Sequence, residues 1–179
     1  MQNGKRIKAV VLAVLTTMTL TAAQEGKPSP NATADVTLGG KKITITYNQP
    51  SARGRKIMGG LVPYGKVWRT GANEATTLTT PVDLMIGGKA VPAGQYTLYS
   101  LPGENSWKLI INKQTGQWGT EYDESQDLAR VDMKLSQLSS PVEQFLISWT
   151  VKSESEADLT MAWEKTRVVV PVKIAAAGK

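Results

Sequence analysis

Three features of the sequence predict an all-β protein, built as an antiparallel, jelly-roll-like β-sandwich with one long ordered Gly-rich loop. Short runs in which apolar and polar residues alternate recur about every ten residues, a spacing typical of sandwiches and barrels. Glycine pairs and proline–glycine steps separate these runs and favour tight turns. No segment shows a convincing amphipathic helical pattern longer than two turns.

The first 23 residues have the three parts of a secretory signal peptide. Lys5, Arg6 and Lys8 form a basic start, and an apolar run of about a dozen residues follows, short of the ~20 needed to span a bilayer. Small residues at 21–23 then offer a cleavage site. We expect an exported protein, periplasmic or extracellular, without membrane association once the signal is removed; an uncleaved anchor is the alternative.

Charge and composition exclude several classes of function. The chain has 21 Lys+Arg and 15 Asp+Glu; without the three bases of the signal, the balance is 18 minus 15, or +3. That is ordinary for a soluble domain, so we expect no nucleic-acid partner. Cysteine and histidine are both absent from the sequence, which excludes Ser-His-Asp and Cys-His nucleophile systems and histidine-containing metal sites. We expect no cofactor and no metal.

The first hairpin is predicted at residues 35–38 and 42–47. Gly39-Gly40 separates the two runs, and a glycine pair suits the two-residue turn of a hairpin. In the second run apolar residues alternate with threonines, the pattern of a half-buried strand.

Further strands are predicted along the rest of the chain, at residues 82–86, 89–91, 95–101, 107–111, 130–135, 142–151, 157–163 and 168–174. The last two are expected to form a closing hairpin around Glu164-Lys165-Thr166. We therefore expect a flexible lead at residues 24–34, one sandwich domain at 35–174, monomeric by default, and a frayed tail at 175–179.

A polar, Gly-rich segment, residues 51–80, separates the first hairpin from the next strand. A loop of this length is usually either functional or disordered. Its apolar residues favour burial, so we expect it to be ordered and packed on the sandwich. The expected anchors are Ile57, Leu61, Val62, Tyr64, Val67 and Trp68.

Two strings within the chain point to a family. Residues 63–76 read PYGKVWRTGANEAT, and residues 86–119 read IGGKAVPAGQYTLYSLPGENSWKLIINKQTGQWG. Over residues 51–149 the chain resembles the domain-of-unknown-function family 2911, which is found in exported bacterial proteins. The resemblance implies a β-sandwich-like domain outside the cytoplasm. It implies no established activity and supplies no catalytic residues.

The candidate binding site combines arginines and aromatic residues of two loops. Arginine presents a rigid fork suited to carboxylates, phosphates or sugar hydroxyls. Loop tryptophans beside arginine and tyrosine are better binding candidates than the strand tryptophans at 107, 149 and 163, which we assign to the core. If the two loops meet, they form one aromatic, charged pocket for a small polar ligand, a saccharide or a peptide. The candidate residues are Arg53, Arg55, Trp68, Arg69, Asn73, Glu74, Trp118 and Tyr122.

Two other functions stay open beside this non-enzymatic binding or envelope-associated module. A carboxylate-dependent hydrolase would use Glu74 with Glu121 or Asp123, because glycosidases need two carboxylates ~5–9.5 Å apart. In a purely structural domain, Trp68 would lie in the core and Arg69 would pair with Glu74. We assign no catalytic residue, and the acids at 123–127 lack the spacing of a calcium loop.

Overall fold

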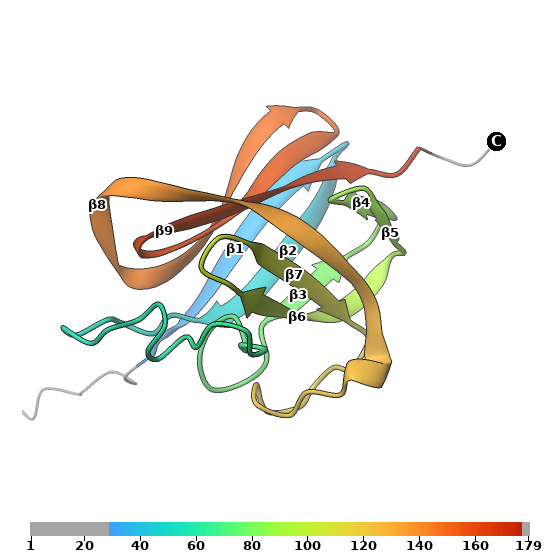
Figure 1. Cartoon of the computed structure of the whole chain (residues 1–179). Helices are drawn as coiled ribbons and strands as arrows, with labels where there is room; N and C mark the ends of the chain where they lie inside the picture. The colour runs from blue at the N-terminus through green and yellow to red at the C-terminus, as the bar shows by residue number, and fades with distance from the viewer. Residues whose placement is uncertain (1–28, 177–179) are drawn as a thin grey trace, which may run out of the picture.

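The computed structural model describes residues 29–176. Within them nine strands and one turn of 3-10 helix, Glu124–Gln126, are formed, and there is no α-helix. The strands are β1 (Asn31–Leu38), β2 (Lys41–Asn48), β3 (Thr77–Thr80), β4 (Leu84–Ile86), β5 (Lys89–Val91), β6 (Gly94–Pro102), β7 (Trp107–Asn112), β8 (Asp127–Ser153) and β9 (Glu156–Ile174) (Figure 1). The all-β prediction is confirmed. This part of the chain contains no helix long and apolar enough to cross a membrane.

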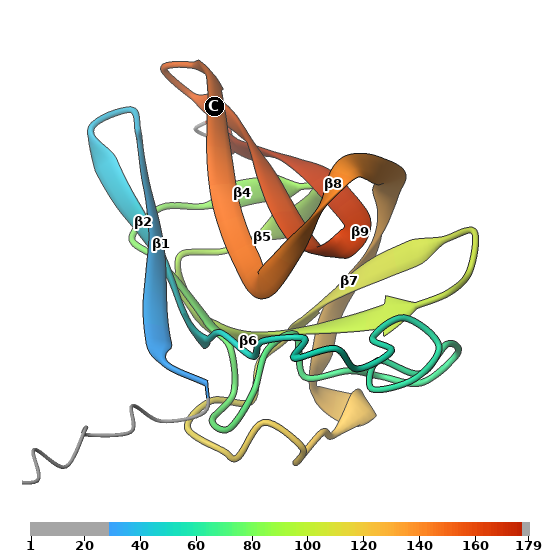
Figure 2. The ribbon, with the colours of Figure 1, turned by 90° about the vertical axis from the view of Figure 1, so that its left-hand side faces the viewer.

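All nine strands belong to one open antiparallel sheet, in the order β1-β2-β3-β6-β7-β8-β9-β4-β5. Strand β8 joins its two halves, because its beginning pairs with β7 and its remainder pairs with β9. The β8–β9 hairpin curls over the half that contains β6 and β7 (Figure 2). One buried core draws its side chains from both halves. Two separate stacked sheets and a jelly-roll order are therefore not confirmed.

The first hairpin is confirmed, with a longer first strand than expected. Gly39 and Gly40 have φ of 52° and 70°, the positive values that a two-residue hairpin turn requires at both positions. Strand β1 begins at Asn31, so residues 31–34 are not a flexible lead. They pair with β2, and Ala34 is buried opposite Ile45. The signal peptide, the rest of the lead and the end of the tail lie outside the described residues.

The closing hairpin expected around Glu164 is wrong. Residues 156–174 form the single strand β9, which pairs with β8 from Glu156 to Val169 and with β4 near its end. Glu164 has a φ of 49° and lies opposite a register shift in β8 between Gln137 and Val142. The two strands therefore bend together at this point, and neither reverses. The hairpin turn lies instead between β8 and β9.

The segment between β2 and β3, residues 49–76, contains no strand. Isolated bridges tie it to the sheet, including Trp68 to Ser100. Ile57 and Val62 are completely buried, but Leu61 and Tyr64 are 45% and 38% exposed. The expectation that Leu61 and Tyr64 are buried anchors is wrong. The backbone hydrogen bonds from Gly59 to Val62 and from Val62 to Ile57 close a tight turn that buries Val62 and leaves its neighbour Leu61 outside.

Candidate functional site

A cavity of about 520 Å³ lies where the 49–76 segment meets the loop that follows β7. This volume is within the usual range for pockets that bind small molecules. Four aromatic side chains border it, those of Trp68, Tyr99, Tyr122 and Trp163. Six of the eight candidate residues line it, namely Arg53, Arg55, Trp68, Arg69, Asn73 and Tyr122.

The other two candidates, Glu74 and Trp118, lie outside the wall of this cavity. They form an antiparallel bridge with each other, which joins the two loops. The backbone N–H of Gly119 adds a hydrogen bond of 3.0 Å to the carbonyl of Asn73. The Glu74 carboxylate accepts a hydrogen bond of 3.0 Å from Asn48 Nδ2, and the Trp118 side chain is 47% exposed. Both residues thus join the two loops outside the cavity wall.

The rings of Trp68 and Trp163 line the cavity as its aromatic floor, and they belong to a larger buried aromatic cluster. The ring of Trp68 stacks on that of Trp163, with centroids 5.9 Å apart and an interplanar angle of 23°. It also meets Phe145 edge-on at 5.0 Å and Trp107 at 6.5 Å. Trp68 is therefore both a core residue and a cavity residue. The sequence placed Trp163 in the core alone, because its strand position indicates only a buried face.

Two of the three arginines that line the cavity, Arg55 and Arg69, are held by neutral backbone carbonyls. Arg55 donates from Nε to the Ala52 carbonyl at 3.0 Å and from Nη2 to that of Ser51 at 2.6 Å. Arg69 Nε donates to the Gly71 carbonyl at 3.3 Å. Within residues 29–176 no ion pair joins Arg69 to Glu74, so the pair that the purely structural alternative requires is not formed. The described part of the wall contains no aspartate or glutamate.

Backbone strain gathers around the cavity. Among the described residues, four that are not glycine have a positive φ, and three of them are Arg53 (49°), Thr70 (54°) and Asn73 (57°). Such conformations cost about 1–3 kcal/mol each and persist only where the surroundings enforce them. Two contacts hold Thr70 in its conformation. Its hydroxyl lies 2.9 Å from that of Ser100, and its carbonyl accepts a hydrogen bond from Thr76 Oγ1 at 2.7 Å. Two of the strained residues, Arg53 and Asn73, line the cavity.

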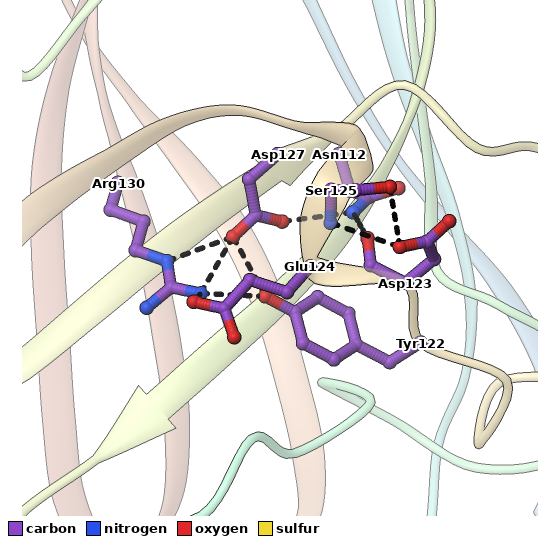
Figure 3. A network of polar contacts seen from close by, with 7 residues as sticks. All are labelled: Asn112, Tyr122, Asp123, Glu124, Ser125, Asp127 and Arg130. Carbon is purple, nitrogen blue, oxygen red and sulfur yellow. Dashed lines mark hydrogen bonds and ion pairs between the residues drawn. The ribbon is translucent and has the colours of Figure 1, made fainter.

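A polar network holds Tyr122 at the cavity wall (Figure 3). The Tyr122 hydroxyl donates to Asp127 Oδ2 at 2.7 Å and accepts from Arg130 Nη2 at 2.8 Å. Asp127 also accepts from Arg130 Nε and from Asn112 Nδ2, each at 2.8 Å. The ring of Tyr122 meets that of Tyr99 edge-on, with centroids 4.8 Å apart. The phenol is thereby fixed in one orientation from behind.

This network makes the stability of the protein depend on pH in the alkaline range. Burial, reinforced by the hydrogen bond to Asp127 and by its charge, raises the pKa of Tyr122 to about 12. The unfolded value is about 10. Because the pKa of Tyr122 is higher in the folded than in the unfolded state, its contribution to the free energy of unfolding is complete below pH ~10 and is lost as the pH rises from ~10 to ~12.

We therefore expect the native protein to have a higher melting temperature than a Tyr122→Phe variant at pH values below ~10. This difference in melting temperature is expected to shrink between pH ~10 and ~12. Circular dichroism melts across this range measure the difference. Tyr64→Phe, a change at an exposed tyrosine outside the network, is the control. An advantage that stays constant up to pH ~12 would contradict the assignment.

The carboxylates proposed for a hydrolase do not gather at the cavity. Glu74, Glu121 and Asp123 are all absent from its wall. Asp123 caps the 3-10 turn, accepting from Ser125 N at 2.9 Å and from Ser125 Oγ at 2.7 Å, and these bonds lower its pKa. In residues 29–176 no group of three or more acidic, histidine or cysteine side chains is placed to hold a metal ion.

Fold and cavity together define an all-β domain with a single curled sheet and an arginine-rich, aromatic-walled pocket. The family model described as "Protein of unknown function (DUF2911)" matches residues 29–172, and the chain belongs to this family. This confirms the resemblance seen in the sequence. No curated protein and no solved structure matches the chain.

Proposed function

We propose that this protein is a non-enzymatic binding module that takes a small polar ligand, a saccharide or a peptide, into the 520 Å³ cavity. The observation that carries the proposal is the wall of this cavity. It combines three arginines and Asn73 with a floor of packed aromatic rings. Pockets for small ligands have this composition, since apolar walls supply contact and a few polar groups fix orientation.

Two further features support binding over catalysis. The strained backbone of Arg53 and Asn73 is supported by the surrounding loops, which suits a pre-formed site. The described wall also offers no pair of carboxylates for acid–base chemistry. If the leader acts as the sequence predicts, the ligand is met outside the cytoplasm, consistent with an envelope-associated role.

A ligand screen tests the proposal. Glycans, metabolites and short peptides are screened by thermal shift against the purified protein, and hits are titrated by calorimetry. Leu61→Trp places a bulky ring at the wall of the cavity on an exposed residue, so it narrows the site at little cost to stability. We expect this substitution to lower the affinity for a ligand in the cavity at least tenfold.

Leu146→Trp is the matched control, because Leu146 is 40% exposed and lies outside this cavity. It is expected to leave the affinity unchanged. A screen without hits, or a ligand that both variants bind equally well, would count against the proposal.

A further inference from the structure

The charge of the cavity wall is one-sided. Arg53, Arg55 and Arg69 line it, and the described part of the wall contributes no acidic side chain. Like charges around one concavity repel each other and raise the local concentration of anions. The cavity therefore favours a ligand that brings negative charge with it.

Two of these guanidinium groups are positioned and still have donors to offer. Arg69 uses Nε for the Gly71 carbonyl, and within residues 29–176 its Nη groups have no hydrogen-bond partner. Arg55 uses Nε and Nη2 for the carbonyls of Ala52 and Ser51. A guanidinium fixed by neutral carbonyls keeps its full charge, and its outer N–H groups match the oxygens of a carboxylate or phosphate.

Gly119 makes room for Arg69. A Cβ at Gly119 would lie 2.6 Å from the Asn73 carbonyl oxygen, 3.0 Å from Arg69 Cδ and 3.3 Å from Arg69 Cβ. The absence of a side chain therefore lets the arginine pass close to the second loop. The position of its head group depends on this contact between the loops.

Beside the arginines, one part of the wall is apolar and partly open, although Ser29, Asn73 and Thr120 also line the cavity. Leu61 is 45% exposed and lines the cavity together with Val67 and Ala72. An inorganic oxyanion would occupy only a part of about 520 Å³, because one water takes up ~30 Å³ of the liquid. The free volume beside the arginines thus has apolar walls that suit a carbon body.

We infer that the ligand is a small organic oxyanion, a carboxylate or phosphate on a largely apolar body. Arg69 and Arg55 bind the oxyanion, and Leu61 and Val67 contact the body. This inference rests on the proposed function and narrows it, since a neutral saccharide satisfies the proposal above and contradicts this one. A free organic acid and the C-terminal carboxylate of a peptide present the same chemistry.

Matched probes on the purified protein test the inference by calorimetry. Phenylacetate and phenyl phosphate carry the charge, phenylacetamide is the neutral counterpart, and inorganic phosphate has no carbon body. We expect both organic anions to bind at least tenfold more tightly than phenylacetamide and than inorganic phosphate. Their affinity is expected to fall several-fold between ~0.05 and ~0.5 M NaCl, because salt screens the pairing. A tripeptide ending in phenylalanine, with a free or an amidated C-terminus, separates the two sources of carboxylate.

Arg69→Gln is expected to lower the affinity for phenylacetate at least tenfold. Arg55→Gln provides an independent variant should the first fail to fold. Arg167→Gln is the matched control, because Arg167 lies on β9 outside the cavity wall. Its affinity for phenylacetate is expected to equal that of the native protein.

The outcomes separate the two proposals. If neutral probes bind as tightly as the anions and Leu61→Trp weakens them, the binding module stands and the oxyanion inference falls. Full affinity in folded Arg69→Gln and Arg55→Gln proteins, or an equal loss in Arg167→Gln, also overturns the inference. If the organic anions fail to bind and the ligand screen is empty as well, both proposals fall.

Discussion

Replacing Trp163 with alanine is expected to lower the free energy of unfolding by about 3–5 kcal/mol. The side chain is 1% exposed and stacks on Trp68, with Phe145 5.9 Å from its ring centre. Its indole N–H donates to the Glu143 carbonyl at 3.0 Å. Truncation removes the contacts that hold the curled β8–β9 hairpin against the 49–76 segment, and it leaves a large void. The melting temperature should fall by roughly 10 °C.

The same chemical change at Trp118 is the control. This residue is 47% exposed, so Trp118→Ala should cost less than ~1 kcal/mol. Urea denaturation of both variants, with the slope of the transition checked for two-state behaviour, gives the two free energies. Similar losses in the two proteins would contradict the assignment of Trp163 to the aromatic floor.

Ile57→Ala is expected to destabilise the whole domain by about 2–5 kcal/mol, although Ile57 lies in a segment without strands. The side chain is completely buried in the common core, and its carbonyl accepts backbone hydrogen bonds from Gly60 and Val62. Because the segment packs into the common core, the packing lost at Ile57 lowers the free energy of unfolding of the whole domain. Urea denaturation again measures the effect.

Leu61→Ala is the companion variant, because Leu61 belongs to the same turn and is 45% exposed. It should change the free energy of unfolding by less than ~1 kcal/mol. Limited proteolysis of the Ile57→Ala protein adds a second readout. Rapid cleavage within residues 49–76, without a change in global stability, would show that the segment opens independently and would refute its place in the core.

The strands that sequence reasoning located well are those whose pattern is local. Strand β2 alternates with a period of two, β7 is a short apolar run after a turn, and glycine pairs mark the turns beside β1 and β4. The continuity of β8 and β9 is different. The predicted strands leave gaps at residues 136–141 and 164–167, but β8 and β9 continue through them because the two strands bend at the same place. The continuity of these two strands depends on their pairing, which the sequence of either strand alone does not show.

The candidate site, too, could be predicted from the sequence only in part. Composition singled out the arginines and aromatic residues of the two loops, because such residues are unusual in plain connections. It did not reveal which way they face. Glu74 and Trp118 lie outside the wall because they pair with each other, and Leu61 faces outward because a tight turn buries Val62. Orientation within a strand-free segment is set by its turns, which have no simple sequence period.

The position of β4 and β5 has a consequence for synthesis of the chain. Among residues 29–176, this pair is hydrogen-bonded to the rest of the sheet only through β9, whose last residues pair with Leu84–Ile86. Until β9 is in place, the β4–β5 hairpin therefore has no partner strand that joins it to the rest of the sheet. Premature termination within that strand would leave open edges, which are templates for aggregation. Residues 172–174 of β9 thus connect the β4–β5 hairpin to the rest of the sheet.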